Sequence, residues 1–421
     1  MNDPVVIVGA GQAGVATAFK LRALGHKGDI TLVGAEPETP YHRPPLSKKF
    51  LTGTATAERL HIRHIDLYAS ERIRLLRGRS ALSIDRAGRR VHLSDGQVLE
   101  FGALVLCTGA QPRRLETSHG GDGTNAYGFR TLEDAERLRS ALVPGQSLLL
   151  VGAGYVGLEL AAVARTLGMR VTIIERDRQV LGRVAAEPTA EWFRNLHESQ
   201  GVAIRTGVRI ADVEYEDGRV SKVRLTDQSE VAVDVLVSGI GVAPQTALAC
   251  AAGLPVDNGI LVDEQGRTQD PAIYAAGDCA NFARQDKRIR LESVQNAVDT
   301  AELVARSICG MSVDGFPTPW FWSEQYTTKL QIAGLNAGYT HVIVRQASDM
   351  SLSVWYYERD SLLAVDAIND PKAFMTARQW LASGLSPMSD DIGNPELPLS
   401  VVRTQSAAET NHQRKSSQRC Q

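Results

Sequence analysis

The sequence contains few cysteines, and none of them has a spacing that indicates redox or metal chemistry. The five are Cys107, Cys250, Cys279, Cys309 and Cys420. No two form a CxxC or CxxxxC pair, and none shows the cysteine–histidine spacing of a zinc site. The nine histidines are scattered without ligand spacing. We therefore expect no metal site, no iron–sulfur cluster bound by this chain, and no redox-active dithiol of the kind that disulfide reductases use.

Charge of one sign and long apolar runs are also lacking. Lys and Arg number 46 against 48 Asp and Glu, which gives a net charge of −2 and no global basic field to attract nucleic acid or a membrane surface. No apolar run approaches the roughly 20 residues that span a bilayer. The first strand is expected to begin at Val5, which leaves no room for a signal peptide. Together these features predict a cytoplasmic protein of two or three domains.

Two copies of the G-x-G-x-x-G fingerprint dominate what is present. The first is Gly9-Ala10-Gly11-Gln12-Ala13-Gly14, after the apolar run 5–8; the second is Gly152-Ala153-Gly154-Tyr155-Val156-Gly157, after the run 148–151. In this motif the first glycine permits a tight turn, the second lets the backbone approach a pyrophosphate, and the third lets helix pack on strand. The helix N-terminus then offers N–H groups to the phosphates. Two copies predict two bound dinucleotides, between which electrons could pass.

An acidic residue follows the second strand of each predicted unit. Glu36 comes after the expected strand 30–33, and Glu175 comes after the expected strand 170–174. Both lie near the offset at which an acid binds the ribose hydroxyls of a dinucleotide. Glu175 would repel a 2′-phosphate and so select NADH over NADPH. Arg176 and Arg178 flank it, and they would instead favour NADPH if they reached the ribose.

Several longer motifs give the chain a family resemblance over about residues 4–400. They are Tyr41–Lys48, Arg130–Ala135, Gly157–Ala161, Ala276–Cys279, Glu292–Ala297 and Pro319–Gln325. With the two fingerprints, they resemble the FAD-dependent ferredoxin reductases of bacterial oxygenase systems. That group includes the putidaredoxin reductase and biphenyl-dioxygenase ferredoxin reductase types, and it is related to apoptosis-inducing factor.

The resemblance implies an architecture like that of glutathione reductase. The fold class would be α/β, with two Rossmann-like dinucleotide-binding domains and a C-terminal α+β domain. We expect a discontinuous FAD-binding domain from residues 1–110 and 245–316, an NADH-binding domain at 111–244 and the C-terminal domain at 317–403. Residues 404–421 carry almost no large apolar side chain and are expected to form a disordered tail.

The resemblance also implies which residues bind the bound cofactor FAD and the substrate NADH. The expected FAD residues are Gly9, Gly11, Gln12, Ala13, Gly14, Glu36, Arg43, Lys48, Ala81, Ala110, Arg130, Asp278, Val294 and Trp320. The expected NADH residues are Gly152, Gly154, Tyr155, Val156, Gly157, Glu159, Glu175, Arg183 and Gly241. The chain departs from the family pattern at Ala35, where members often carry a second acid.

Three of these residues are expected to act at the reacting end of the flavin. In similar proteins a lysine matching Lys48 lies beside flavin N5 and pairs with an acid matching Glu159, and an aromatic matching Trp320 packs near the two rings. An acid partner avoids an uncompensated buried charge. Helix 293–309 is expected to aim its positive end at the flavin pyrimidine, which favours the electron-rich flavin.

These features predict an NADH:ferredoxin oxidoreductase. Hydride would pass from NADH to FAD, and single electrons would pass to a separate, small, acidic [2Fe–2S] ferredoxin that serves a cytochrome P450 or a Rieske-type oxygenase. The protein would be a monomer or homodimer. The candidate basic docking residues are Lys48, Lys49, Lys287, Arg288, Arg290 and Lys329.

Two other classes stay open at this stage. One is an NADH oxidase or peroxidase, which usually carries a redox cysteine near position 42, where this chain has Tyr41-His42-Arg43. The other is a non-enzymatic, NADH-sensing flavoprotein like apoptosis-inducing factor.

Overall fold

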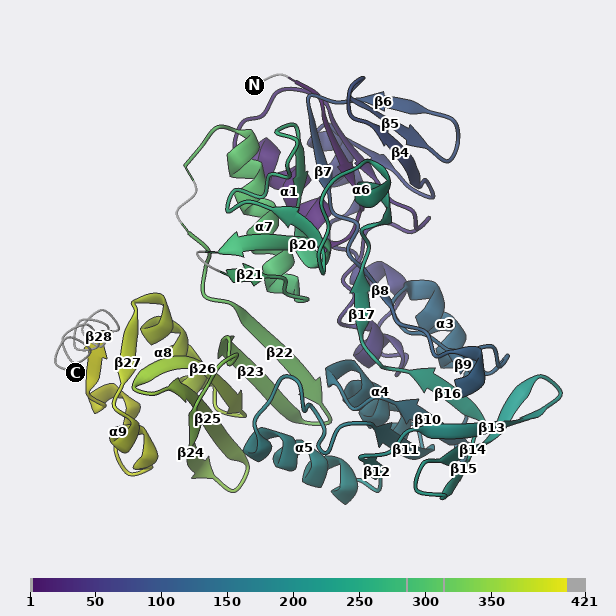
Figure 1. Cartoon of the computed structure of the whole chain (residues 1–421), viewed down its shortest axis with the longest axis vertical. Helices are drawn as coiled ribbons and strands as arrows, with labels where there is room; N and C mark the ends of the chain where they lie inside the picture. Colours follow the sequence, from purple (N-terminus) through teal and green to yellow (C-terminus); the bar gives the residue numbers. More distant parts are fainter. Residues whose placement is uncertain (1–2, 285–286, 313–314, 407–421) are drawn as a thin grey trace, which may run out of the picture. The chain divides into compact units, whose positions relative to one another are not determined.

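The chain divides into two compact units that alternate along the sequence (Figure 1). The computed structural model describes residues 3–284, 287–312 and 315–406. The first unit comprises Met1–Arg113, Arg130–Ala135 and Val242–Phe316, and the second comprises Arg114–Phe129, Glu136–Gly241 and Pro317–Gln421. The expected division into three domains stays a prediction, although the expected discontinuity of the first domain is visible in the first unit.

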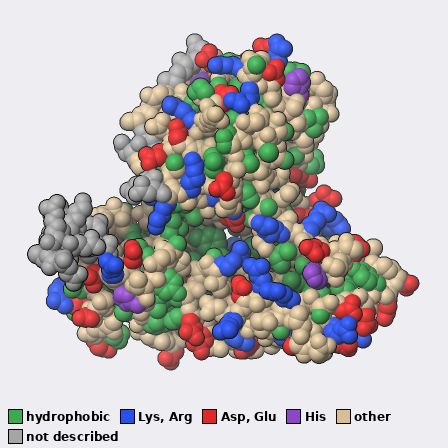
Figure 2. Space-filling view, viewed as in Figure 1, with side chains coloured by type: hydrophobic (Ala, Val, Ile, Leu, Met, Phe, Trp, Pro, Cys, Tyr) green, Lys and Arg blue, Asp and Glu red, His purple; other side chains and the backbone are tan. Residues whose placement is uncertain are grey.

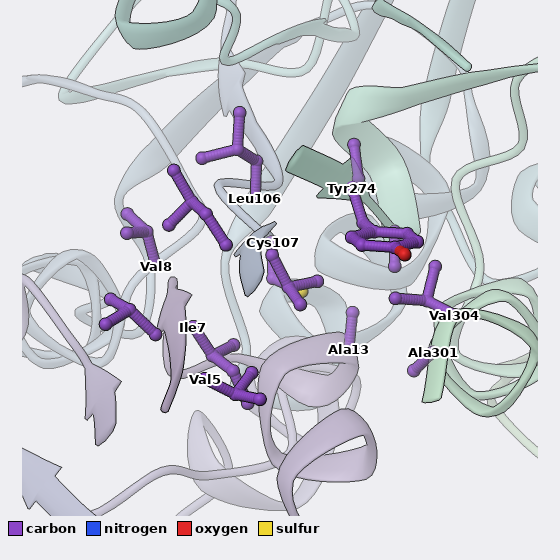
Figure 3. Packing of buried hydrophobic residues seen from close by; sticks show 14 of the residues in the cluster. Val5, Ile7, Val8, Ala13, Leu106, Cys107, Tyr274, Ala301 and Val304 are labelled. Atoms are coloured by element: carbon purple, nitrogen blue, oxygen red, sulfur yellow. The ribbon is translucent and has the colours of Figure 1, made fainter. Parts of the chain in front are cut away.

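A five-stranded parallel sheet of order β19-β7-β1-β2-β3 forms the centre of the first unit. Its strands are β1 (Val5–Val8), β2 (Ile30–Val33), β3 (Ile73–Leu76), β7 (Ala103–Leu106) and β19 (Ile273–Ala275). β1 and β2 are apolar or nearly so and entirely buried, as expected of strands covered on both faces. The helices α1 (Gln12–Ala23) and α7 (Val294–Ile308) pack beside them, and Figure 3 shows Ala13 of α1 near Ala301 and Val304 of α7.

Smaller elements surround this sheet. They are η1 (Leu46–Phe50), η2 (Ala57–Leu60), α2 (Ile65–Ser70), β4 (Ala81–Asp85), β5 (Arg90–Leu93), β6 (Val98–Glu100), β8 (Ala110–Pro112), β17 (Val242–Pro244), α6 (Ala247–Ala251), β18 (Ile260–Val262), η4 (Gly277–Cys279), β20 (Ala280–Arg284) and β21 (Lys287–Ile289). β8 and β17 pair antiparallel at the two places where the chain leaves and re-enters the unit.

The second unit contains a parallel sheet of the same plan, with order β12-β11-β10-β16-β9. Its strands are β9 (Ala126–Tyr127), β10 (Ser147–Val151), β11 (Arg170–Glu175), β12 (Ala203–Thr206) and β16 (Val235–Ser238). The other elements of this part are η3 (Thr117–His119), α4 (Tyr155–Thr166), α5 (Glu187–Ser199), β13 (Ile210–Glu216), β14 (Arg219–Leu225) and β15 (Glu230–Ala232). The helix α3 (Leu132–Ala141) begins in the first unit and ends in the second. β13, β14 and β15 form a separate antiparallel sheet.

An antiparallel sheet of order β22-β23-β26-β25-β24 belongs to the same unit. Its strands are β22 (Trp320–Gln325), β23 (Thr328–Gly334), β24 (His341–Ser348), β25 (Ser351–Glu358) and β26 (Ser361–Ile368). It is followed by α8 (Pro371–Ala382), β27 (Leu385–Pro387), α9 (Ser389–Gly393), η5 (Leu399–Val401) and β28 (Thr404–Ser406). α8 packs on β23 and β26 over a core that includes Trp355 and Phe374. The expected α/β class with an added C-terminal α+β region is confirmed.

The expected start of the disordered tail at residue 404 is wrong. Thr404–Ser406 form β28, which pairs antiparallel with β27, and Arg403 before it forms an ion pair of 2.7 Å with Asp391. Composition missed this strand because its pairing uses backbone hydrogen bonds, which need no large apolar side chain. Residues 407–421 lie outside the described residues. None of the helices in the described ranges combines the length and apolarity that crossing a membrane requires.

A buried carboxyl group connects the C-terminal sheet to α5. Asp366 of β26 is 1% exposed, and it accepts hydrogen bonds from Thr189 Oγ1 of α5 at 2.8 Å and from Tyr356 Oη at 2.5 Å. Burial raises the pKa of Asp366 to about 6, although the two hydrogen bonds oppose the shift. Between about pH 4 and pH 6 the folded protein therefore keeps a proton on Asp366, whereas Asp366 in the unfolded protein is already ionised.

This proton makes stability depend on pH in a direction opposite to the usual one for acids. Between about pH 4 and pH 6 the folded protein binds more protons at Asp366, so this residue's contribution to stability falls as pH rises through that window and is constant above it. Between pH 5 and pH 8 we expect the free energy of unfolding to fall by roughly 1 kcal/mol because of Asp366. Asp366→Asn should remove that slope. Urea unfolding of both proteins at the two pH values measures it, and parallel curves would refute the assignment.

Candidate functional site

The first glycine fingerprint forms a turn too tight for side chains at two of its three glycines. Gly9 has a φ of +111°, and a Cβ there would lie 2.0 Å from the carbonyl oxygen of Cys107 on the neighbouring strand. A Cβ on Gly14 would lie 1.9 Å from the carbonyl oxygen of Gly9. Gly11 is different, because a Cβ there would meet nothing within 4 Å and its φ of −84° suits any residue. The chain's own packing therefore explains the first and third glycines but not the second.

The second fingerprint repeats this pattern. A Cβ on Gly152, whose φ is +104°, would lie 2.5 Å from the carbonyl oxygen of Gly239, and one on Gly157 would lie 2.3 Å from that of Gly152. Gly154 again has open space around it. In both copies the middle glycine leaves room for something outside the protein.

Both middle glycines are also the N-cap residues of twelve-residue helices, α1 and α4. Glycine has no side chain to cap the first turn, so the backbone N–H groups there can face a ligand. The positive end of each helix favours an anion, and phosphate is the anion that such termini bind. The residues present therefore fit the pyrophosphate of FAD at the first fingerprint and of NADH at the second.

Gln12 and Ala13 are the first two residues of α1. They lie within the first fingerprint, whose glycine turn and helix N-terminus we call the first cradle, and the second fingerprint forms the second cradle. The Oε1 atom of Gln12 is buried and has no hydrogen-bond partner among the described residues. A buried amide oxygen of this kind favours a bound donor group. Ala13 packs into the core and would contribute its backbone.

The acid expected at the FAD ribose lies in a polar cluster near the end of β2. Glu36 Oε1 accepts from Arg43 Nη2 at 2.5 Å, and its other oxygen accepts from Tyr41 Oη. Arg43 Nη1 also donates to the carbonyl oxygen of Arg130 at 2.8 Å, and Tyr41 Oη accepts from the N–H of Leu132 at 2.8 Å. Burial raises the pKa of Tyr41, so this hydroxyl stays a donor to Glu36. Tyr41 was not assigned a role from sequence, although it lies in a motif that carries the resemblance.

A second ion pair in the first unit joins two other expected FAD residues. Arg130 Nη2 lies 2.9 Å from Asp278 Oδ2, and Asp278 follows β19 in the short helix η4. Because both side chains are mostly buried, the pair fixes Asp278 beside the carboxyl end of the sheet. The two residues are 148 positions apart in the sequence, and the fold brings them into contact.

The remaining residues expected around FAD in the first unit take up separate positions. Ala81 begins β4, Ala110 begins β8, and Val294 begins α7. Ser293 caps α7 by accepting from the N–H of Asn296 at 3.1 Å. Lys48 lies in the wide turn of η1 with a non-helical φ of −132°, and its Nζ contacts the carbonyl oxygen of Pro44 at 3.4 Å.

Backbone amides fix the position of the acid expected at the NADH ribose. Glu175 Oε2 accepts from the N–H of Ala153 inside the second fingerprint at 2.8 Å, and Oε1 accepts from the N–H of Asp177 at 2.9 Å. The carboxylate is therefore held against the glycine loop before any nucleotide binds. Arg176 and Arg178 are both exposed, and Arg176 lies 3.6 Å from Asp177.

Two other residues expected at NADH lie close together. Arg183 Nη2 would be 3.4 Å from a Cβ on Gly241, whose φ is +93°. Val156, in the first turn of α4, is 46% exposed, which is unusual for valine and leaves it available for contact. The side chain of Tyr155 points elsewhere: its ring packs on that of Phe321 with centroids 4.8 Å apart, and its hydroxyl is buried.

Glu159 is buried in α4, with 5% exposure, as its apolar sequence surroundings predicted. Its Oε1 accepts a hydrogen bond of 2.7 Å from Ser323 Oγ of β22. Lys48 belongs to the first unit and Glu159 to the second, so their pairing stays a prediction.

Trp320 begins β22 and is half-buried. Its ring lies 5.6 Å from Trp322 and 5.9 Å from Phe374, measured between centroids, and the Arg378 guanidinium stacks over it at 5.3 Å. These contacts within the second unit give it a defined orientation. A role near the flavin stays a prediction.

The described cysteines do not form a redox pair. Cys107, Cys250, Cys279 and Cys309 are all free thiols. Burial raises the pKa of Cys107 and of Cys279, which disfavours the reactive thiolate at both. Across the described residues, no cluster of His, Cys, Asp and Glu side chains could hold a metal ion.

Comparison with known proteins places these features in one family. Residues 3–301 match the family described as pyridine nucleotide-disulphide oxidoreductase, and residues 320–402 match the family described as reductase C-terminal. The putidaredoxin reductase of Pseudomonas putida is 42% identical over 97% of this chain and 98% of its own length. The rhodocoxin reductase of Rhodococcus erythropolis is 40% identical over 94% of each chain.

Solved structures agree. A covalent putidaredoxin reductase–putidaredoxin complex contains a chain that superposes with a TM-score of 0.92 at 43% identity, covering 95% of this chain and 97% of that one. The ferredoxin reductase for the CYP199A2 system of Rhodopseudomonas palustris gives a TM-score of 0.92 at 36% identity, with 95% and 99% coverage. The chain therefore belongs to the pyridine nucleotide-disulphide oxidoreductase family and, within it, to the FAD-dependent ferredoxin reductases.

Proposed function

We propose that the chain oxidises NADH and reduces a small [2Fe–2S] ferredoxin, which in turn supplies an oxygenase. The observation that carries the proposal is the repeated cradle. In each fingerprint the protein's own packing does not require the middle glycine, which is the N-cap residue of a helix that has no side-chain cap. Two such cradles in one chain support two dinucleotides bound together. FAD supplies the chemistry that joins two-electron oxidation of NADH to one-electron reduction of a protein acceptor.

The protein's own residues hold and orient these groups. At the first cradle Gly9, Gly11 and Gly14 would bind the FAD pyrophosphate, Glu36 the adenosine ribose and Asp278 the ribityl chain. At the second, Glu175 would accept from both ribose hydroxyls of NADH. Its carboxylate bonds to the amide of Ala153 inside the fingerprint, and a carboxylate at the ribose would repel a 2′-phosphate, which supports NADH over NADPH. Arg176 and Arg178 are both exposed.

The proposed acceptor is an acidic ferredoxin that docks through basic residues. Of the six candidates, Lys49, Lys287 and Arg288 are exposed in the first unit. Arg290 is a weaker candidate, because it is mostly buried and pairs with Glu292 at 2.7 Å. Charges of both signs are interspersed on the visible surface of each unit, so only a local patch could provide this attraction (Figure 2).

We place the reaction in the cytoplasm, with the protein as a monomer or homodimer. The four free thiols among the described residues suit a reducing compartment. Several relatives are themselves named as ferredoxin reductases, and two, from Pseudomonas putida and Ectopseudomonas oleovorans, are named rubredoxin-NAD(+) reductases. The acceptor is therefore the part of the proposal that most needs direct measurement.

A steady-state assay tests the whole proposal. Purified protein should contain about one FAD per chain, oxidise NADH in preference to NADPH, and do so rapidly only when a [2Fe–2S] ferredoxin is added. Fast NADH oxidation that consumes oxygen without ferredoxin would instead indicate an oxidase. NADH binding without turnover under any of these conditions would indicate a sensing flavoprotein.

Alanine substitutions at the middle glycines should separate the two cradles. Gly11→Ala places a methyl group in open space, so we expect a folded protein with a flavin-to-protein ratio far below one. Gly154→Ala should keep FAD, which dithionite still reduces, but lose reduction by NADH. Absorbance and stopped-flow measurements read both effects. Gly9→Ala is the contrast, because its Cβ would clash with Cys107 and should impair folding itself. Normal FAD and NADH reactions in both middle-glycine variants would contradict the assignment of the cradles.

A double-mutant cycle tests the expected meeting of Lys48 and Glu159. Lys48→Ala should lower the flavin midpoint potential and slow its reduction by NADH, since a cation favours the electron-rich flavin. Losing one partner of a buried pair costs about 3–5 kcal/mol, less where solvent enters. Glu159→Ala should affect the same step, and the double variant should be less impaired than the sum of the two. Lys49→Ala, an exposed neighbour, is the control. Additive effects with an unchanged potential would show that the residues do not meet.

A further inference from the structure

The strand β22 carries different chemistry on its two faces. Trp320 and Trp322 lie on the face that meets Phe374 of α8. Ser323 and Gln325 have the alternate parity and are each 1% exposed. They lie on the face that contacts α4 and α5, and Figure 1 shows β22 running alongside these helices.

A continuous chain of hydrogen bonds runs along the inner face of β22. Ser323 Oγ lies 2.7 Å from Glu159 Oε1, and Gln325 Nε2 lies 3.2 Å from Ser323 Oγ. Gln325 Oε1 lies 2.8 Å from Nε2 of His197, which is on α5 and fully buried. Tyr326 Oη completes the chain at 3.4 Å from His197 Nδ1. Five side chains, from α4, α5, β22 and the turn that follows β22, are thus connected in sequence from Tyr326 to Glu159.

The chemistry of the groups gives this chain one direction. The Ser323 hydroxyl donates its hydrogen to Glu159 Oε1. Ser323 Oγ then accepts from the amide of Gln325, which turns the Gln325 oxygen towards His197.

The orientation of Gln325 settles that of the histidine. An amide oxygen only accepts, so His197 must donate from Nε2, and its Nδ1 is left to accept from Tyr326. Burial lowers the pKa of His197, although its bond to Gln325 opposes the shift, and the neutral ring that this arrangement needs is the favoured form. Every donor points towards Glu159, and aligned hydrogen bonds of this kind strengthen one another.

We propose that Ser323, supported by Gln325 and His197, is a positioning residue that holds the Glu159 carboxylate in place for hydride transfer from NADH. The proposal rests on the proposed function, since it assumes that Glu159 acts at the NADH site. A buried carboxylate needs donors, and a donor that is itself held by two further buried groups restricts the side chain to one position. The C-terminal sheet thereby contributes to a site otherwise built from α4 and the second fingerprint.

The key variant is Ser323→Ala, which removes the hydroxyl that bonds to Glu159 and leaves Glu159 itself unchanged. A hydrogen bond to a charged group corresponds to roughly ten- to a hundredfold in an equilibrium or rate. We expect the limiting rate of flavin reduction by NADH to fall by about this factor in anaerobic stopped-flow measurements. FAD content, reduction by dithionite and the affinity for NAD⁺ by calorimetry should stay close to those of the parent, because the glycine cradles are intact. Ser323→Thr should restore most of the rate.

Ser353→Ala is the matched control. Ser353 is a fully buried serine in the same sheet, where it bonds to Trp355 and to the Arg345 carbonyl rather than to Glu159. Its loss should lower the melting temperature about as much as Ser323→Ala but leave flavin reduction unaffected. Gln325→Met, which interrupts the chain one step away from Ser323, should slow reduction less than Ser323→Ala does.

The outcomes separate this proposal from the function it builds on. In a Glu159→Gln background Ser323→Ala should add little further loss, because the group it positions is no longer ionised. Equal reduction rates in Ser323→Ala and Ser353→Ala, or additive effects of Ser323→Ala and Glu159→Gln, would overturn the positioning role. A parent protein that NADH cannot reduce would overturn the proposed function instead.

Discussion

Both dinucleotide sites depend on one steric contact, that between the first and third glycines of each fingerprint. In each copy the third glycine lies so close to the carbonyl of the first that no side chain fits between them. This contact brings the start of the helix directly over the end of the first strand, and only there can the helix N-terminus face a phosphate. A Cβ on the first glycine would in turn clash with the carbonyl of the residue that follows a neighbouring strand, Cys107 after β7 or Gly239 after β16. The sheet register therefore determines the geometry of each cradle.

Local sequence patterns predicted the parts of the fold that this contact organises. The strand 30–33 was predicted with its observed bounds, and the helix expected at 293–309 is α7, which begins and ends one residue inside that range. Periodic apolar residues and glycine turns are local signals, and they determine these elements almost independently of the rest of the chain. The spacing of Glu36 and Glu175 from the glycines was informative for the same reason. Glu175 ends β11 and Glu36 lies three residues after β2, so the chain distance from each fingerprint to its acid reflects a fixed βαβ geometry.

The interactions that the sequence did not reveal are those between distant segments. The partners of Glu36 included Tyr41, which no pattern distinguished from a core tyrosine. Ser323 and Gln325 lie in a recognised motif, but only the fold shows that they face α4 and α5 rather than α8. Their alternation with Trp320 and Trp322 was a usable signal, since buried polar residues at every second position of a strand indicate a face that is covered by polar partners. The strand at 404–406 was missed because backbone pairing leaves almost no trace in composition.

Two buried polar networks, rather than apolar packing alone, define how the C-terminal sheet sits on α4 and α5. One ends at Asp366, which reaches Thr189 of α5, and the other ends at Glu159 of α4. Misalignment of such contacts is costly, because a buried carboxyl group without its hydrogen bonds destabilises the fold far more than a shifted methyl group does. They therefore specify one docking geometry where apolar surfaces alone would tolerate several. Burial raises the pKa of Asp366 to about 6, so this group takes up a proton at mildly acidic pH. The two carboxyl groups thus differ at one interface: Asp366 bonds to α5, and Glu159 connects the sheet to α4, which begins at the second fingerprint and the proposed NADH site.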